Sequence, residues 1–109
     1  MLILYFKMDI LRLLGKYPNK LPVIIQRHIR CNDIPQLKRK KYLLPKHIHM
    51  ADLLFYIRAQ LTVPPHISIY VLVGNSLPSL NQTLSLIYEE ERAEDGFLYI
   101  CYSSEHAFG

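Results

Sequence analysis

The stretch ISIYVLVGNSLPSLNQTLSLIYEEERAEDGFLYICYS, residues 67–103, decides the fold because it joins two strands through a turn and a helix. Residues 67–74 are rich in β-branched and aromatic side chains, which is typical of a strand. The following GNSLPS contains the glycine and proline of a turn. Residues 83–91 have helical spacing with Thr83 as the N-cap, and residues 96–103 predict a last aromatic strand.

The first half of the chain adds two helices and two strands. Apolar side chains at helical spacing predict helices over residues 8–16 and 49–61, and Pro64 ends the second of them. KLPVIIQRH, residues 20–28, predicts a strand because of its β-branched centre. KKYLLP, residues 40–45, predicts a short strand that is apolar on both sides.

This order is the β-grasp arrangement of ubiquitin, an α+β fold with a mixed four-stranded sheet, here behind an N-terminal helical extension. We predict one domain over residues 1–109, with the extension at 1–17 and a flexible C-terminal tail at 103–109. A ferredoxin-like fold needs a strand before its first helix, and MLILY, residues 1–5, is a candidate for that strand. The order of elements leaves both arrangements open.

Charge is distributed unevenly along the chain. Residues 1–60 hold 12 of the 13 Lys and Arg and 3 of the 9 acids, a balance of +9, whereas residues 61–109 hold one Arg and six acids, a balance of −5. One face should therefore be basic and favour an acidic peptide, phospholipid or nucleic acid. Two cysteines without a secretory signal predict a reducing compartment.

Several short patterns have an ordinary and a functional interpretation. KRKK at 38–41 is a nucleic-acid patch or a solvated face, and the second interpretation is favoured because no RNA-recognition motif accompanies it. His47, His49 and His66 lack further ligands at metal-binding spacing, so we predict no metal site. Cys101 lies in an apolar strand and is interpreted as a core residue.

The opening MLILYFK, residues 1–7, is apolar and ends in a basic residue. Its apolar part is far shorter than the roughly 20 residues of a membrane-spanning helix. It either packs on the domain, which we favour, or lies in a membrane interface as a second membrane signal.

Three separated motifs then point to a family. KYPNKLPVI at 16–24, KKYLLP at 40–45 and DGFLYICYSSEHAFG at 95–109 resemble the autophagy ubiquitin-like modifiers, the group of GABARAP and microtubule-associated light chain 3, over about residues 9–109. The ending resembles a plant-type subgroup whose glycine is already terminal. The resemblance implies a monomeric, non-enzymatic modifier without a cofactor. It would be cytoplasmic, and would lie on the autophagosome or vacuole membrane once it carries a lipid.

The resemblance implies that Gly109 is conjugated to phosphatidylethanolamine. Activating and conjugating enzymes supply the catalysis, Phe108 anchors the tail in them, and a cysteine protease removes the lipid again. Glycine suits this position because it presents the least hindered carbonyl. The group's other partners are motif-bearing cargo receptors and microtubules, and no nucleic acid is expected.

The resemblance also implies binding of peptides of the form aromatic-x-x-aliphatic along KKYLLP, by strand addition. Lysines at 20, 38 and 41 would contact the acids that flank such peptides. The aromatic pocket carried over from the family is Asp9, Leu13, Pro22, Ile24, Lys41, Leu43 and Phe97. The aliphatic pocket is Tyr42, Leu44, Pro45, Ile48, Leu53, Tyr56 and Arg58.

The chain departs from the family's pattern at three places. Its N-terminus is shorter, Asp9 stands where Glu is usual, and Gln60 stands where a basic residue is usual. The alternatives are therefore an unconjugated β-grasp peptide-binding module and, further off, a small RNA-binding domain. We find no nucleophile, base and orienting group at motif spacing, which argues against an independent enzyme.

Overall fold

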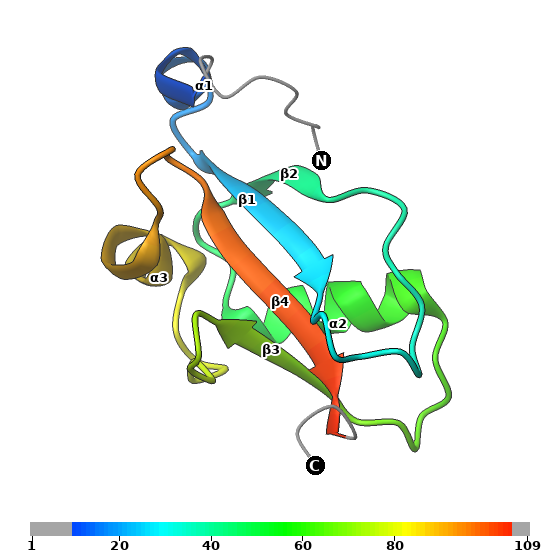
Figure 1. Cartoon of the computed structure of the whole chain (residues 1–109). Helices are drawn as coiled ribbons and strands as arrows, with labels where there is room; N and C mark the ends of the chain where they lie inside the picture. Colours follow the sequence, from blue (N-terminus) through cyan, green and yellow to red (C-terminus); the bar gives the residue numbers. More distant parts are fainter. Residues whose placement is uncertain (1–9, 106–109) are drawn as a thin grey trace.

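The computed structural model describes residues 10–105, in which three helices and four strands follow in the predicted order (Figure 1). Residues 1–9 of the expected extension at 1–17, and the end of the tail, lie outside the described residues. The elements are α1 (Ile10–Lys16), β1 (Lys20–Arg27), β2 (Lys41–Pro45), α2 (Met50–Leu61), β3 (Ile69–Val73), α3 (Leu84–Glu91) and β4 (Leu98–Ser104).

The four strands form one mixed sheet in the order β2-β1-β4-β3. β1 pairs antiparallel with β2 and parallel with β4, and β4 pairs antiparallel with β3. This topology confirms the predicted α+β, ubiquitin-like fold. The ferredoxin-like alternative is wrong, because β1 and β4 occupy the two central positions that an N-terminal strand would need.

The two faces of the sheet pack against different helices. The buried side of α2 packs on one face, and we call this assembly the α2 core. On the opposite face Ile10 of α1 packs with Leu43 and Phe97, and we call this smaller group the α1 cluster. The α2 core includes Val23, Ile25, Tyr42, Leu44, Met50, Leu53, Ile57, Leu61, Leu98, Ile100 and Tyr102.

Local signals place the helix ends. The Thr83 hydroxyl accepts a hydrogen bond from the Leu86 amide at 3.3 Å, which confirms Thr83 as the N-cap of α3. At the start of α2 the carboxylate of Asp52 accepts from the His49 amide at 2.9 Å. The helix ends at Leu61, and the C-cap residue Thr62 has a left-handed backbone with φ 54°, ahead of two prolines.

The C-terminal tail begins later than predicted. Ser103 and Ser104 belong to β4 and have no exposed surface, although both are polar. The tail expected from residue 103 therefore starts after Ser104. Sequence pattern misses the burial of Ser104 because its hydroxyl donates to Asp33, which lies 71 positions away.

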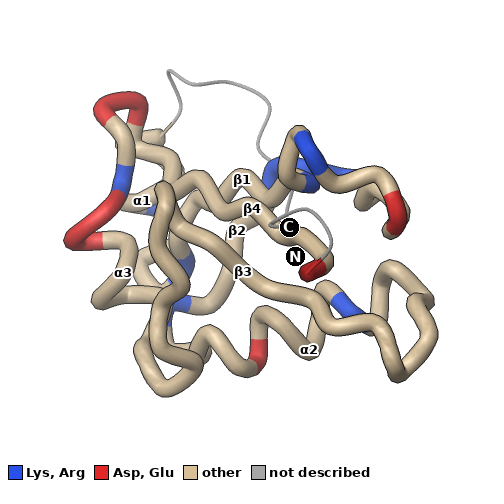
Figure 2. The backbone as a smooth tube through the Cα atoms, turned by 60° about the horizontal axis from the view of Figure 1, so that its bottom comes forward, with Lys and Arg blue, Asp and Glu red and all other residues tan. Residues whose placement is uncertain are grey.

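The charges separate only in part in space, because Arg92 follows the acids of α3 and Asp33 lies in the loop between β1 and β2. Figure 2 shows the acids of the last turn of α3 and the following loop on one side, away from the basic residues around the loop between β1 and β2. No helix within residues 10–105 is long and apolar enough to cross a membrane.

Candidate functional site

β2 is an edge strand that contributes side chains to both faces of the sheet. It lies at one end of the strand order, with β1 as its neighbour. Tyr42 and Leu44 belong to the α2 core, whereas Leu43 belongs to the α1 cluster. The predicted alternation along KKYLLP is therefore confirmed. A peptide strand added at this edge would meet a different set of side chains on each face.

The predicted aromatic-pocket residues lie together where α1 meets the β1–β2 hairpin. Leu43 and Phe97 are buried at the centre, and two of the half-buried residues pack against them. Pro22 is buried opposite Leu43 in the strand register. Asp9 lies outside the described residues. The residues that the structure brings together are Leu13, Pro22, Ile24, Lys41, Leu43 and Phe97.

The predicted aliphatic-pocket residues are brought together only in part. Three of them are buried in the α2 core, and Ile48 and Tyr56 pack against it while partly exposed. Pro45 is the exposed last residue of β2. The Arg58 guanidinium donates to the carbonyl oxygens of Ile67 at 2.6 Å and Pro64 at 3.1 Å. It fixes the loop after α2. The three buried residues are Tyr42, Leu44 and Leu53.

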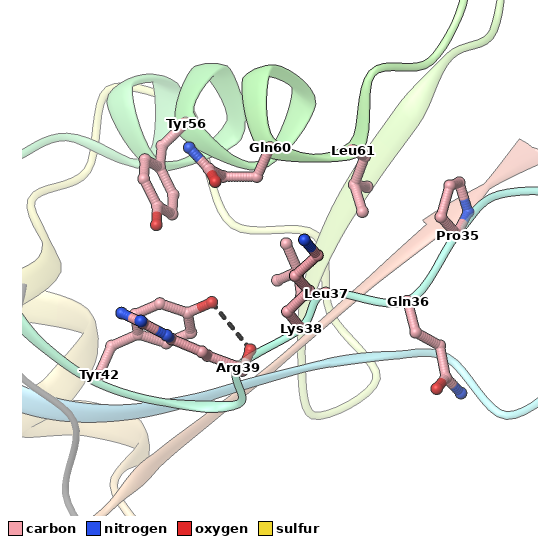
Figure 3. Close-up of a pocket in the computed structure, with 9 residues that line it drawn as sticks. All are labelled: Pro35, Gln36, Leu37, Lys38, Arg39, Tyr42, Tyr56, Gln60 and Leu61. Carbon is pink, nitrogen blue, oxygen red and sulfur yellow. Dashed lines mark hydrogen bonds between the residues drawn. The ribbon is translucent and has the colours of Figure 1, made fainter.

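A hollow of about 530 Å³ lies between α2 and the loop that enters β2 (Figure 3). Tyr42 and Tyr56 are the two predicted pocket residues that line it. Figure 3 shows their rings on facing elements, and the ring centroids are 6.2 Å apart in an edge-to-face arrangement. The other lining residues are Pro35, Gln36, Leu37, Lys38, Arg39, Gln60 and Leu61.

The pocket prediction missed most of these lining residues for an identifiable reason. Pro35–Arg39 lie in a loop without periodicity, and they approach the end of α2 only through the tertiary structure. Lys38 was predicted as a contact for acidic residues, and Gln60 was noted only as a departure from the family. Lys38 and Gln60 have in common only that they are polar, and polarity alone does not identify a pocket.

The phenol of Tyr42 is held in place at the edge of the hollow. Its hydroxyl donates to the carbonyl oxygen of Arg39 at 2.8 Å (Figure 3). Burial, with a smaller contribution from neighbouring Tyr56, raises the pKa of Tyr42 to about 12. The ring is therefore neutral at physiological pH and fixes the path of the chain into β2.

The three predicted lysine contacts lie around the β1–β2 hairpin. Lys20 is paired with Pro45 and Lys41 with Ile24, so the two lysines are at opposite ends of the hairpin register. Lys38 is exposed and belongs to the hollow. This arrangement offers positive charge near both ends of a peptide laid along β2.

The side chains considered as metal ligands are not grouped in the part of the chain that the structure describes. Within residues 10–105, no three His, Cys, Asp or Glu side chains are grouped as metal ligands. Cys101 is half-buried in β4, and burial raises the pKa of its thiol. The thiol is therefore protonated at neutral pH. Cys101 belongs to neither cluster, so the prediction of a core residue is not met, and Cys31 is the cysteine buried in the α2 core.

Comparison with known proteins now bears on this site. Residues 7–109 match the family model described as autophagy protein Atg8, ubiquitin-like. The chain belongs to the Atg8 family. It is 40% identical over 98 residues to autophagy-related protein 8d of Arabidopsis thaliana, covering 90% of this chain and 81% of that protein. It is also 40% identical over 98 residues to autophagy-related protein 8 of Mycosarcoma maydis, covering 90% and 82%.

The solved structures agree with this assignment. The crystal structure of Trypanosoma brucei ATG8 superposes with a TM-score of 0.82 at 25% identity, and covers 91% of this chain and 84% of that one. The predicted family is thereby confirmed, and the chain is an autophagy protein of the ubiquitin-like type. Within the Atg8 family, the β2 edge and the hollow beside it are the candidate binding site, and the residues after Ser104 are the candidate tail. Phe108 and Gly109 lie outside the described residues.

Proposed function

We propose that this Atg8-family protein is conjugated through Gly109 to phosphatidylethanolamine and binds aromatic-x-x-aliphatic peptides along β2. The observation that carries the peptide-binding part is the edge strand β2, whose Leu43 faces one side of the sheet while Tyr42 and Leu44 face the other. Family membership and the residues Phe108 and Gly109 within the matched range support the conjugation part.

The conjugation requires chemistry that partner enzymes supply. A free carboxylate is a poor acyl donor, so Gly109 must first be adenylated with ATP and then transferred to an enzyme cysteine as a thioester. The amine of the lipid attacks that thioester, an amide bond forms, and the cysteine thiolate leaves. This chain contributes the acyl group. Phe108 gives the enzymes a large side chain to hold beside a glycine that fits a narrow channel.

The peptide site uses both faces of the sheet at the β2 edge. Side chains three positions apart on an added strand are separated by about 10 Å, so one reaches the α1 side and the other the α2 side. The hollow at Tyr42 and Tyr56 receives the aliphatic residue. The α1 cluster receives the aromatic residue after α1 shifts, because Leu43 and Phe97 are covered in the free chain.

Positive charge selects among such peptides. Lys20, Lys38 and Lys41 surround the β1–β2 hairpin and favour acids beside the motif. Each exposed pair adds only about 0–1 kcal/mol, so charge adjusts affinity while the two pockets define the motif. Cargo receptors, the family's cysteine protease and microtubules are the corresponding partners. The protein is cytoplasmic before conjugation and on autophagosomal membrane after it.

Reconstitution tests the conjugation. Purified protein is incubated with the family's activating and conjugating enzymes, ATP, magnesium and phosphatidylethanolamine liposomes, and its intact mass is measured. The expected result is a mass increase of one lipid, and Gly109→Ala should reduce it by at least tenfold because a methyl group hinders the carbonyl. If a control modifier is conjugated under the same conditions and the wild-type chain is not, the conjugation proposal fails and only the peptide-binding function remains.

A further inference from the structure

We propose that Ser104, Asp33 and Cys31 form a latch that fixes where the C-terminal tail leaves the domain. The Ser104 hydroxyl donates to the Asp33 Oδ1 at 2.6 Å, across 71 positions of sequence. The Cys31 Sγ lies 3.4 Å from the same oxygen and 3.8 Å from the Ser104 Oγ. Ser104 has no exposed surface and Cys31 is 2% exposed, whereas Asp33 is an exposed loop residue, so the carboxylate closes over a buried hydroxyl.

The latch lies where the ladder between the central strands stops. The last pair between β1 and β4 joins Arg27 and Tyr102, so Ser103 and Ser104 extend beyond β1. On the other side Ser104 is paired with Ile69 of β3. On the side of Ser104 that faces away from β3, β1 no longer pairs with β4. There the latch joins Ser104 to the loop after β1.

The loop is itself anchored to β4 by further contacts. The Tyr102 hydroxyl donates to the carbonyl oxygen of Pro35 and accepts from the Leu37 amide, both at 2.9 Å. The Arg27 guanidinium donates to the carbonyl oxygen of Ile34 at 2.8 Å. These bonds hold the loop that contains Asp33 against β1 and β4, so the position of Asp33 beside Ser104 is fixed.

The position of the latch defines the reach of the tail. Five residues follow Ser104 up to Gly109, and five residues span at most about 18 Å. An enzyme that binds both the body of the domain and Gly109 depends on that reach, because fixing the start of the tail raises the effective concentration of its end. This consequence rests on the proposed conjugation, whereas the latch itself does not.

Hydrogen exchange tests the latch independently of conjugation. Amide exchange at residues 103–105, followed by nuclear magnetic resonance, should be at least tenfold faster in Ser104→Ala and Asp33→Ala, since a hydrogen bond to a charged group is lost. Ser103→Ala is the matched control, because Ser103 is equally buried but donates only to the neighbouring Ser104 carbonyl at 3.1 Å. Asp33→Asn retains an acceptor and should restore most of the protection.

The double variant Asp33→Ala/Ser104→Ala should exchange no faster than either single variant, because both remove the same bond. In the reconstituted reaction, Ser104→Ala and Asp33→Ala should lower kcat/KM for thioester formation severalfold, with Ser103→Ala and Asp33→Asn near wild type. Equal exchange in Ser104→Ala and Ser103→Ala overturns the latch. Faster exchange with an unchanged kcat/KM overturns its role in positioning the tail. If the wild-type chain forms no adduct, the proposed function fails, and exchange still decides the latch.

Discussion

The two faces of the sheet are built to different extents. The α2 core joins buried side chains from all four strands and two helices, whereas the α1 cluster has three buried members under a helix of seven residues. Ile10 is the only buried residue of α1, and Leu11 on the same helix is 84% exposed. Since stability follows buried apolar area, the α2 face should carry most of the folding free energy.

This difference matters for binding. A peptide along β2 must insert one side chain on each face, and the two faces accept it in different ways. On the α2 side the hollow is already present beside Tyr56. On the α1 side Leu43 and Phe97 must be uncovered by movement of α1. Because α1 is held by few buried contacts, moving it requires little free energy. The α1 face is therefore the face that can uncover its pocket for a peptide.

The largest expected effect separates the two faces by stability. Leu53→Ala removes a side chain with no exposed surface from the α2 core and should reduce the free energy of unfolding by about 2–5 kcal/mol. The corresponding substitution on the other face is Leu13→Ala, which truncates a half-buried side chain of α1. It should reduce the free energy of unfolding by less than half as much. Urea titration measures both, and equal costs would contradict the comparison.

The next effect concerns the contact that holds α1. Gly96 has φ +89°, and a Cβ there would lie 2.6 Å from the Ile10 Cγ2. Gly96→Ala should therefore destabilise the protein by about 1–3 kcal/mol and increase amide exchange in α1, since the left-handed backbone and the clash both oppose the methyl group.

Gly15→Ala is the control for this substitution, because a Cβ at Gly15 meets no atom within 4 Å. It should stabilise α1 by about 0.5–1 kcal/mol, as alanine is the better helix former. Slower exchange in Gly96→Ala than in wild type would show that α1 is not held at this contact.

A smaller effect tests the preformed hollow. Tyr56→Ala removes one ring of the hollow and should weaken a WxxL-type peptide by about five- to tenfold, as expected for loss of an aromatic contact. Phe55→Ala, one position along α2 and 77% exposed, should leave the affinity within twofold. Isothermal titration distinguishes them, and equal losses would mean that the peptide occupies the outer face of α2.

The smallest effect tests the charges beside the hollow. Lys38→Glu should weaken an acid-flanked peptide about threefold at low salt, and the loss should shrink as salt increases. Arg92→Glu makes the same change of charge near α3 and should have no effect on the peptide. A loss that is independent of salt would indicate a packing role for Lys38.

Much of the fold could be predicted before the structure was known. The helical spacing of Met50, Leu53 and Ile57 predicted α2, and their side chains are buried as expected. The two-residue alternation through Tyr42, Leu43 and Leu44 predicted which face each would join. Both patterns are local, so residues a few positions apart are sufficient to reveal them.

The site was less predictable, because its parts come from distant positions. The resemblance assigns Arg58 to the aliphatic pocket, and only the structure shows that its guanidinium donates to carbonyl oxygens of the loop after α2. Leu37 and Leu61 line the hollow from a loop and a helix end. These two residues become neighbours only because the loop packs against the end of α2. A loop of this kind has no periodic pattern in the sequence that would predict the contact.

The sequence by itself determined the elements, the two-sided β2 strand and the family, since these depend on local spacing and on short motifs. Only the tertiary structure decided which face is densely packed, where the hollow lies, and that Ser103 and Ser104 end the last strand in the interior. The physical reason is that these features depend on contacts between residues that are far apart in the chain. A polar residue such as Ser104 is buried only when a partner satisfies its hydrogen bond, and that partner, Asp33, lies 71 positions away.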